Sequence, residues 1–124
     1  MDIIVMVVII IVGTFFLGMG VFALAAPSAL SKPFRIVVDA PESRSEIRAV
    51  YGGFGIAVAV VLGLAAADIG SIRPGVLVTV ASALGGMAAG RLVSRLLDKP
   101  TAFYPIWFYF WVEAVAAALL FGVA

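Results

Sequence analysis

Residues 3–26 read IIVMVVIIIVGTFFLGMGVFALAA, a run that contains no charged side chain. An α-helix of about 20 apolar residues is long enough to cross the roughly 30 Å hydrocarbon core of a bilayer. Three further apolar stretches of similar length follow, at about residues 47–67, 72–97 and 103–123. The sequence therefore predicts an all-α integral membrane protein with four transmembrane helices.

The composition agrees with this prediction. Of the 124 residues, 65% are hydrophobic and 12% are charged, whereas a soluble domain has about 45–50% apolar and about 25% charged residues. The length fits a single domain, residues 1–124. The chain has no cysteine and no histidine, so we expect no metal site and no resident cofactor. The net charge of +1, without a basic run, gives no indication of nucleic-acid binding.

The connections between the spans set the topology. Residues 27–46 form a long loop, whereas residues 68–71 and 98–101 are tight turns that force antiparallel neighbours, so we expect an up-down-up-down bundle. The side of the loop carries five cations, Lys32, Arg35, Arg44, Arg95 and Lys99. The opposite side carries Arg73 alone. By the positive-inside rule, the loop should be cytoplasmic and both termini should lie on the other side of the inner membrane.

Small residues should mediate helix packing, because lipid tails are as apolar as leucine and burial alone cannot drive association. The last three spans each carry Gly, Ala or Ser at four-residue spacing. The glycines expected at helix contacts are Gly52, Gly55, Gly63, Gly86 and Gly90. Packing within the bundle is the simpler interpretation, and homodimerisation is the alternative. On the first interpretation, Gly86→Leu and Gly90→Leu should disrupt the bundle.

Two charged residues lie well inside the predicted spans. At a rise of 1.5 Å per residue, Glu113 lies roughly 15 Å into the fourth span and Arg91 roughly 10 Å from the end of the third. A charge at the centre of a helix costs about 2.5–3.5 kcal/mol on insertion scales, so such residues usually face the protein interior. Because these spans are antiparallel neighbours, Arg91 and Glu113 should meet. The second span adds three residues near the same end, Glu46, Arg48 and Tyr51.

This predicted intramembrane polar cluster has two interpretations. It is either a structural ion pair that fixes the helix register, or a site for an anionic headgroup, a quinone-like ligand or a proton. One carboxylate with two arginines provides no nucleophile beside a base, so we expect no catalytic residues and no enzymatic activity.

Seven of the nine residues from Phe103 to Trp111 are aromatic. A belt of aromatic residues at the membrane interface explains the start of this run. It explains Trp111 poorly, because this residue lies close to Glu113 in depth. We therefore expect Trp107, Phe108 and Trp111 to form a surface for a partner protein or a flat ligand.

Three features together resemble a known family. They are the run EIRAVYGG at residues 46–53, the sequence Gly90-Arg91-Leu92, and Glu113 in an apolar fourth span. This pattern resembles domain of unknown function 4345, a bacterial membrane family without an assigned reaction or ligand, and is more distantly similar to the DoxX-like group of small four-helix proteins. The resemblance covers nearly the whole chain. It implies that the five residues of the predicted polar cluster belong to one shared pattern.

The short chain, with almost nothing outside the bilayer, suggests a non-enzymatic accessory or structural subunit of a larger bioenergetic or photosynthetic complex. Its partners would be the lipid bilayer and other membrane chains or further copies of itself. The alternatives are a small homo-oligomeric transporter and a protein that binds a lipid or a quinone, with a membrane enzyme that modifies a lipid or a quinone as the least favoured. Against proton-coupled transport, Arg91 beside Glu113 favours the charged carboxylate.

Overall fold

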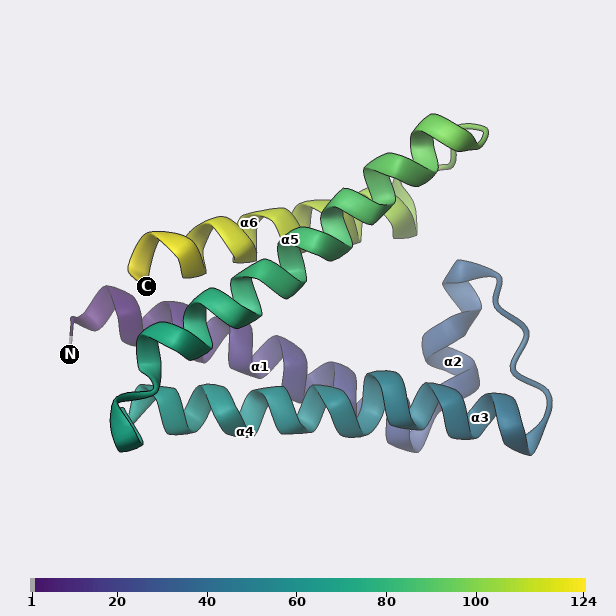
Figure 1. The fold of residues 1–124 in the computed structure, drawn as a ribbon. Helices are drawn as coiled ribbons and strands as arrows, with labels where there is room; N and C mark the ends of the chain where they lie inside the picture. The colour runs from purple at the N-terminus through teal and green to yellow at the C-terminus, as the bar shows by residue number, and fades with distance from the viewer. Residues whose placement is uncertain (1) are drawn as a thin grey trace.

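The computed structural model describes residues 2–124 and consists of helices joined by short connections (Figure 1). The α-helices are α1 (Ile3–Ala25), α2 (Pro27–Ser31), α3 (Pro41–Ile47), α4 (Phe54–Ala66), α5 (Arg73–Leu97) and α6 (Phe108–Val123). Short 3₁₀ turns lie at Lys32–Phe34 and Ile69–Ser71, and π-helical segments lie at Arg48–Gly53 and Phe103–Trp107. The π-helical segments extend α4 and α6 at their N-terminal ends.

Four helices are long and apolar enough to cross a membrane, namely Ile3–Ala25, Pro41–Ala66, Arg73–Leu97 and Phe103–Val123. The all-α prediction with four spans is confirmed. The two termini lie at the same end of the molecule, and α2 lies at the opposite end (Figure 1). This arrangement is compatible with the up-down-up-down topology expected from the short turns.

The second span begins earlier than expected, at Pro41 rather than near Ile47. Proline is well tolerated at the first position of a helix, because its missing N–H would have no partner there. The Ser43 hydroxyl accepts a hydrogen bond from the Ala40 backbone N–H at 3.2 Å, which helps to fix this start. Part of the predicted loop is therefore helical, and α2 occupies another part of it.

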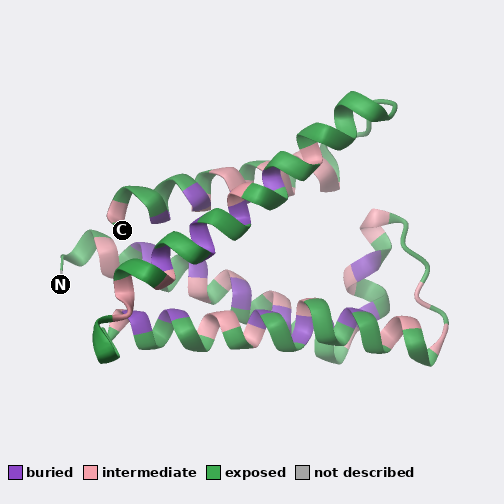
Figure 2. Cartoon of the chain, in the orientation of Figure 1, coloured by how far each residue is buried: buried purple, intermediate pink, exposed green. Residues whose placement is uncertain are grey.

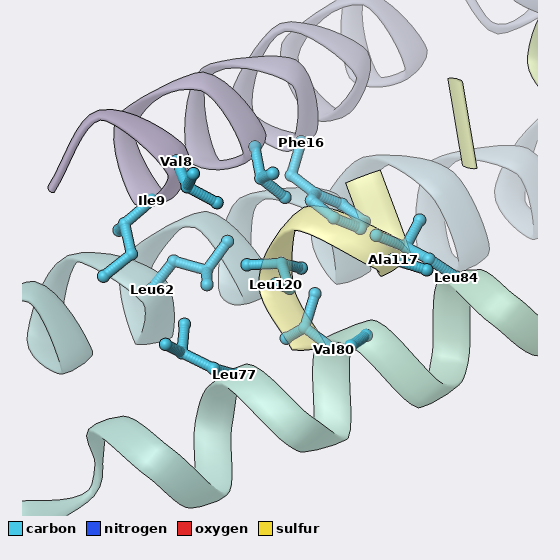
Figure 3. Packing of buried hydrophobic residues seen from close by; sticks show 11 residues of the cluster. Val8, Ile9, Phe16, Leu62, Leu77, Val80, Leu84, Ala117 and Leu120 are labelled. Atoms are coloured by element: carbon cyan, nitrogen blue, oxygen red, sulfur yellow. The ribbon is translucent and has the colours of Figure 1, made fainter. Parts of the chain in front are cut away.

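The helices pack in two antiparallel pairs, α1 with α4 and α5 with α6, and both α4–α5 and α1–α6 contacts join the pairs. The buried side chains of the core come from all four spans (Figure 3). Leu62, Leu77 and Leu120 are fully buried there. The outer faces remain exposed along the helices (Figure 2), as apolar faces toward lipid should be.

Glycines bring the backbones of α1 and α4 together. A Cβ atom added to Gly20 would lie 2.8 Å from the Gly52 carbonyl oxygen and from the Ile56 backbone nitrogen. A Cβ atom added to Gly55 would lie 2.9 Å from the Phe16 carbonyl oxygen. The structure thus places Gly52 and Gly55 at a close helix contact, together with Gly20 of the first span.

The other three glycines expected at helix contacts lie elsewhere. Gly63, Gly86 and Gly90 are exposed, and an added Cβ atom at each would meet nothing within 4 Å. The expectation that they pack within the bundle is wrong, because the buried face of α4 carries Leu62 and that of α5 carries Leu77 and Ala81 instead. Gly86→Leu and Gly90→Leu should consequently leave the fold intact.

Candidate functional site

The central feature of the site is an ion pair between α5 and α6. Arg91 Nε donates a hydrogen bond to Glu113 Oε1 at 2.7 Å, and Arg91 Nη2 donates one to Glu113 Oε2 at 2.9 Å. The pair forms because α5 and α6 are antiparallel neighbours that are in contact along their length. The Glu113 side chain is only 2% exposed. Such a bidentate ion pair fixes the orientation of both side chains and therefore the register of the two helices.

Arg91 also lies against two aromatic rings. Its guanidinium carbon is 5.8 Å from the centre of the Phe34 ring and 5.9 Å from that of Tyr109. The two rings are 5.3 Å apart. Both distances to the cation are within the range of cation–π attraction. Arg91 is thus held by Tyr109 and Glu113 of α6 and by Phe34 of the 3₁₀ turn after α2.

A cavity of about 300 Å³ adjoins the ion pair. It lies toward the end of the molecule that carries α2, because Leu30 and Ser31 of α2 are among its lining residues. Most of its lining is apolar or aromatic, and includes Phe15, Met19, Leu30, Phe34, Leu84 and Met87. Its polar lining comes from Ser31, Tyr51, Arg91, Tyr109 and Glu113.

The segment after α1 lines the cavity at this end. Leu30 and Ser31 of α2 line it, as does Ile36 beyond the following 3₁₀ turn. The Ser28 hydroxyl donates a hydrogen bond to the Val38 carbonyl oxygen at 3.1 Å, which links α2 to the extended chain that follows. Part of the expected cytoplasmic loop therefore forms a wall of the site.

A family model with the description "Domain of unknown function (DUF4345)" matches residues 4–124. The chain belongs to the DUF4345 family. The match extends over all four spans and includes both members of the ion pair. The chain matches no curated protein and no solved structure.

Two members of the predicted polar cluster lie away from the ion pair in this DUF4345 chain. Arg48 Nε donates a hydrogen bond to the Leu24 carbonyl oxygen at 3.0 Å, near the C-terminal end of α1. The last carbonyls of a helix lack partners within the helix, and Arg48 satisfies one of them. Glu46 is exposed. The cluster therefore consists of Arg91, Glu113 and Tyr51, without the first two residues.

Sequence reasoning missed three residues of the site, namely Ser31, Phe34 and Tyr109. Ser31 and Phe34 fall within residues 27–46, which were expected to form the long cytoplasmic loop. Tyr109 precedes Glu113 by four residues, and residues at this spacing share one face of a helix. This spacing could have identified Tyr109 as a neighbour of the ion pair. It was overlooked because Tyr109 is one of seven aromatic residues in the same segment.

The three aromatic residues expected to form a partner or ligand surface lie outside the cavity. Phe108 and Trp111 are exposed, Trp111 to 56%. Trp107 lines a different pocket, between the end of α5 and the start of the fourth span. None of the three touches the ion pair through a hydrogen bond or salt bridge among the described residues.

Proposed function

We propose that this DUF4345 protein is a non-enzymatic membrane protein that binds an amphiphilic ligand, such as a lipid or a quinone, in the cavity beside Arg91. The observation that carries the proposal is the hydrogen-bonding state of Arg91. A guanidinium has five N–H donors, and two of them bond to Glu113, so three remain. A ligand with an acceptor oxygen would satisfy these donors from within a largely apolar cavity.

The lining supports the same ligand class. Ligand sites are mostly apolar and contain a small number of polar groups that orient the ligand. Here the apolar walls suit a hydrocarbon or ring, while Arg91, Tyr51 and Ser31 provide hydrogen-bonding groups. Both carboxylate oxygens of Glu113 accept hydrogen bonds from Arg91, so this carboxylate is poorly placed to act as a free base or proton carrier.

Filling the cavity tests this proposal. Leu30→Trp places a larger side chain on the cavity wall, and Ala29→Trp places the same side chain on the exposed side of α2. Decylubiquinone and oleate serve as probes, because they differ in headgroup and both carry acceptor oxygens. We expect at least one probe to raise the melting temperature of the wild type and of Ala29→Trp in a concentration-dependent way. Leu30→Trp should lose this response, and an undiminished response in Leu30→Trp would contradict the proposal.

A second candidate function is that of an accessory subunit that packs against other membrane chains. The supporting observation is that Gly86 is exposed on α5 and nothing lies within 4 Å of an added Cβ atom there, so another helix could approach closely. Trp111 adds a large exposed ring on α6. Purification in a mild detergent tests this candidate: a stable assembly with other chains supports it, and a lone chain counts against it.

We further propose that both termini face the non-cytoplasmic side of a bacterial inner membrane. The excess of Lys and Arg at the end that carries α2 supports this orientation. Reporter fusions test it at Ala124 and in the extended segment at Asp39. The reporter at Asp39 should be active in the cytoplasm, and the one at Ala124 should not. A cytoplasmic Ala124 would reverse the orientation.

A further inference from the structure

A second pocket, of about 690 Å³, lies between the last turns of α5 and the start of the fourth span. Its charged lining consists of Arg91, Arg95, Lys99 and Asp98. Ser94 and Thr101 add hydroxyl groups, and Trp107 forms part of the wall. Arg91 and Met87 line this pocket as well as the inner cavity, so the two spaces adjoin each other there.

The charges of this pocket are not balanced. Arg91 is neutralised by Glu113. The described residues 2–124 contain salt bridges only at Arg73 and Arg91, so Arg95, Lys99 and Asp98 have no ionic partner among them. Two free cations therefore face one free carboxylate. Arginine, lysine and hydroxyl groups are the side chains that bind phosphate oxygens in proteins.

The position of the pocket points to a ligand from the bilayer. It lies at the end of two spans, where lipid headgroups meet the ends of transmembrane helices. Leu96 and Leu97 beside it are 84% and 80% exposed, and offer an apolar surface next to the cations. Tryptophan, here Trp107, favours this depth.

We propose that this pocket binds the phosphate of a lipid headgroup that has a net negative charge, namely that of an anionic glycerophospholipid. Gly90 keeps the pocket open, because it lines the pocket and nothing lies within 4 Å of its added Cβ position. This site is distinct from the amphiphile cavity, and its function does not depend on that cavity being occupied.

The fluorescence of Trp107 can report on the pocket directly. The chain has two tryptophans, so Trp111→Phe leaves Trp107 as the single emitter. The protein in a neutral maltoside detergent is titrated with dihexanoyl phosphatidylglycerol or with dihexanoyl phosphatidylcholine, which have the same acyl chains. We expect the anionic lipid to change the emission in a saturable way, at a roughly tenfold lower concentration than the zwitterionic one.

Further variants in this background locate the response. Gly90→Leu should fill the pocket and abolish the response to phosphatidylglycerol. Gly86→Leu is the matched control, because it adds the same side chain to an exposed position of α5 outside the pocket. Replacing both cations, with Arg95→Gln and Lys99→Gln, should remove the preference for the anionic lipid. Leu30→Phe, which enlarges a wall residue of the inner cavity without adding a tryptophan, should leave the response unchanged.

Glycerol 1-phosphate, which is soluble and has no acyl chains, tests whether the bound phosphate belongs to a membrane lipid or to a soluble molecule. If it binds more than about tenfold more weakly than phosphatidylglycerol, the phosphate is that of a membrane lipid. If it binds as tightly, the pocket still recognises an anionic phosphate, but from a soluble molecule. Equal responses to both lipids, or a preference that survives loss of both cations, would overturn the proposal.

Discussion

Arg91→Ala and Glu113→Ala are each expected to destabilise the folded protein by about 3–5 kcal/mol, because each leaves a buried charge without its partner. The effect of losing Arg91 should be especially severe, since the Glu113 side chain is only 2% exposed and accepts both of the hydrogen bonds from Arg91. The measurement is thermal or denaturant-induced unfolding in detergent, together with the amount of protein that accumulates in the membrane.

The double variant, with Arg91→Ala and Glu113→Ala, tests whether the two residues stabilise the protein as a pair or independently of each other. With both residues changed to alanine no lone charge remains, so the double variant should be clearly less unstable than the sum of the two single variants predicts. Replacement by Met at Arg91 and Leu at Glu113 preserves more of the volume and should cost less still. Strict additivity of the single effects would mean that the ion pair contributes no coupling energy. It would also remove the structural role that we assign to the pair.

Gly20→Ala is expected to destabilise the protein by about 1–3 kcal/mol through overpacking, and Gly20→Leu should separate α1 from α4. The added Cβ would meet the backbone of α4 at 2.8 Å, and backbone atoms cannot rotate away as the tip of a side chain can. Gly55→Ala should behave in the same way, because its Cβ would approach the Phe16 carbonyl oxygen. Unfolding in detergent measures both effects.

Gly18→Ala is the matched control in the same helix. Nothing lies within 4 Å of the Cβ that it adds, and alanine favours helix over glycine by up to about 1 kcal/mol. Gly18→Ala should therefore be neutral or slightly stabilising. If Gly20→Ala were equally harmless, the close approach of α1 and α4 at this position would be disproved.

Contacts between helices joined by a short turn could be predicted from the sequence, whereas contacts between helices joined by a long segment could not. The Arg91–Glu113 pair could be predicted because one short turn joins their helices and the depth of each residue follows from helix geometry. Glu46 and Arg48 are predicted to join the same cluster from their depth, the helix face that Arg48 shares with Tyr51 and the shared family pattern. None of these tells which other helix that face meets. Arg48 instead satisfies a carbonyl of α1, a contact between residues 24 positions apart.

The glycines illustrate the same limit. Four-residue spacing shows that small residues share a helix face, but it does not tell whether that face meets another helix or lipid. Only the packing of the helices separates Gly52 and Gly55, at the α1–α4 contact, from Gly86 and Gly90, where nothing lies within 4 Å of an added Cβ atom. Inside a membrane both environments are apolar, so the sequence has no hydrophobic contrast that could distinguish them.

The sequence by itself determined that the chain is helical, that four segments can cross a bilayer, and that Arg91 and Glu113 lie within it. Those features follow from hydrocarbon thickness, helix rise and the cost of buried charge, which act on each segment separately. The tertiary structure decided the rest: the α1–α4 glycine contact, the cavity lined in part by α2, and the pocket at the end of α5. These depend on how the two helix pairs diverge and on where the segment after α1 folds back, and no local pattern of residues specifies either.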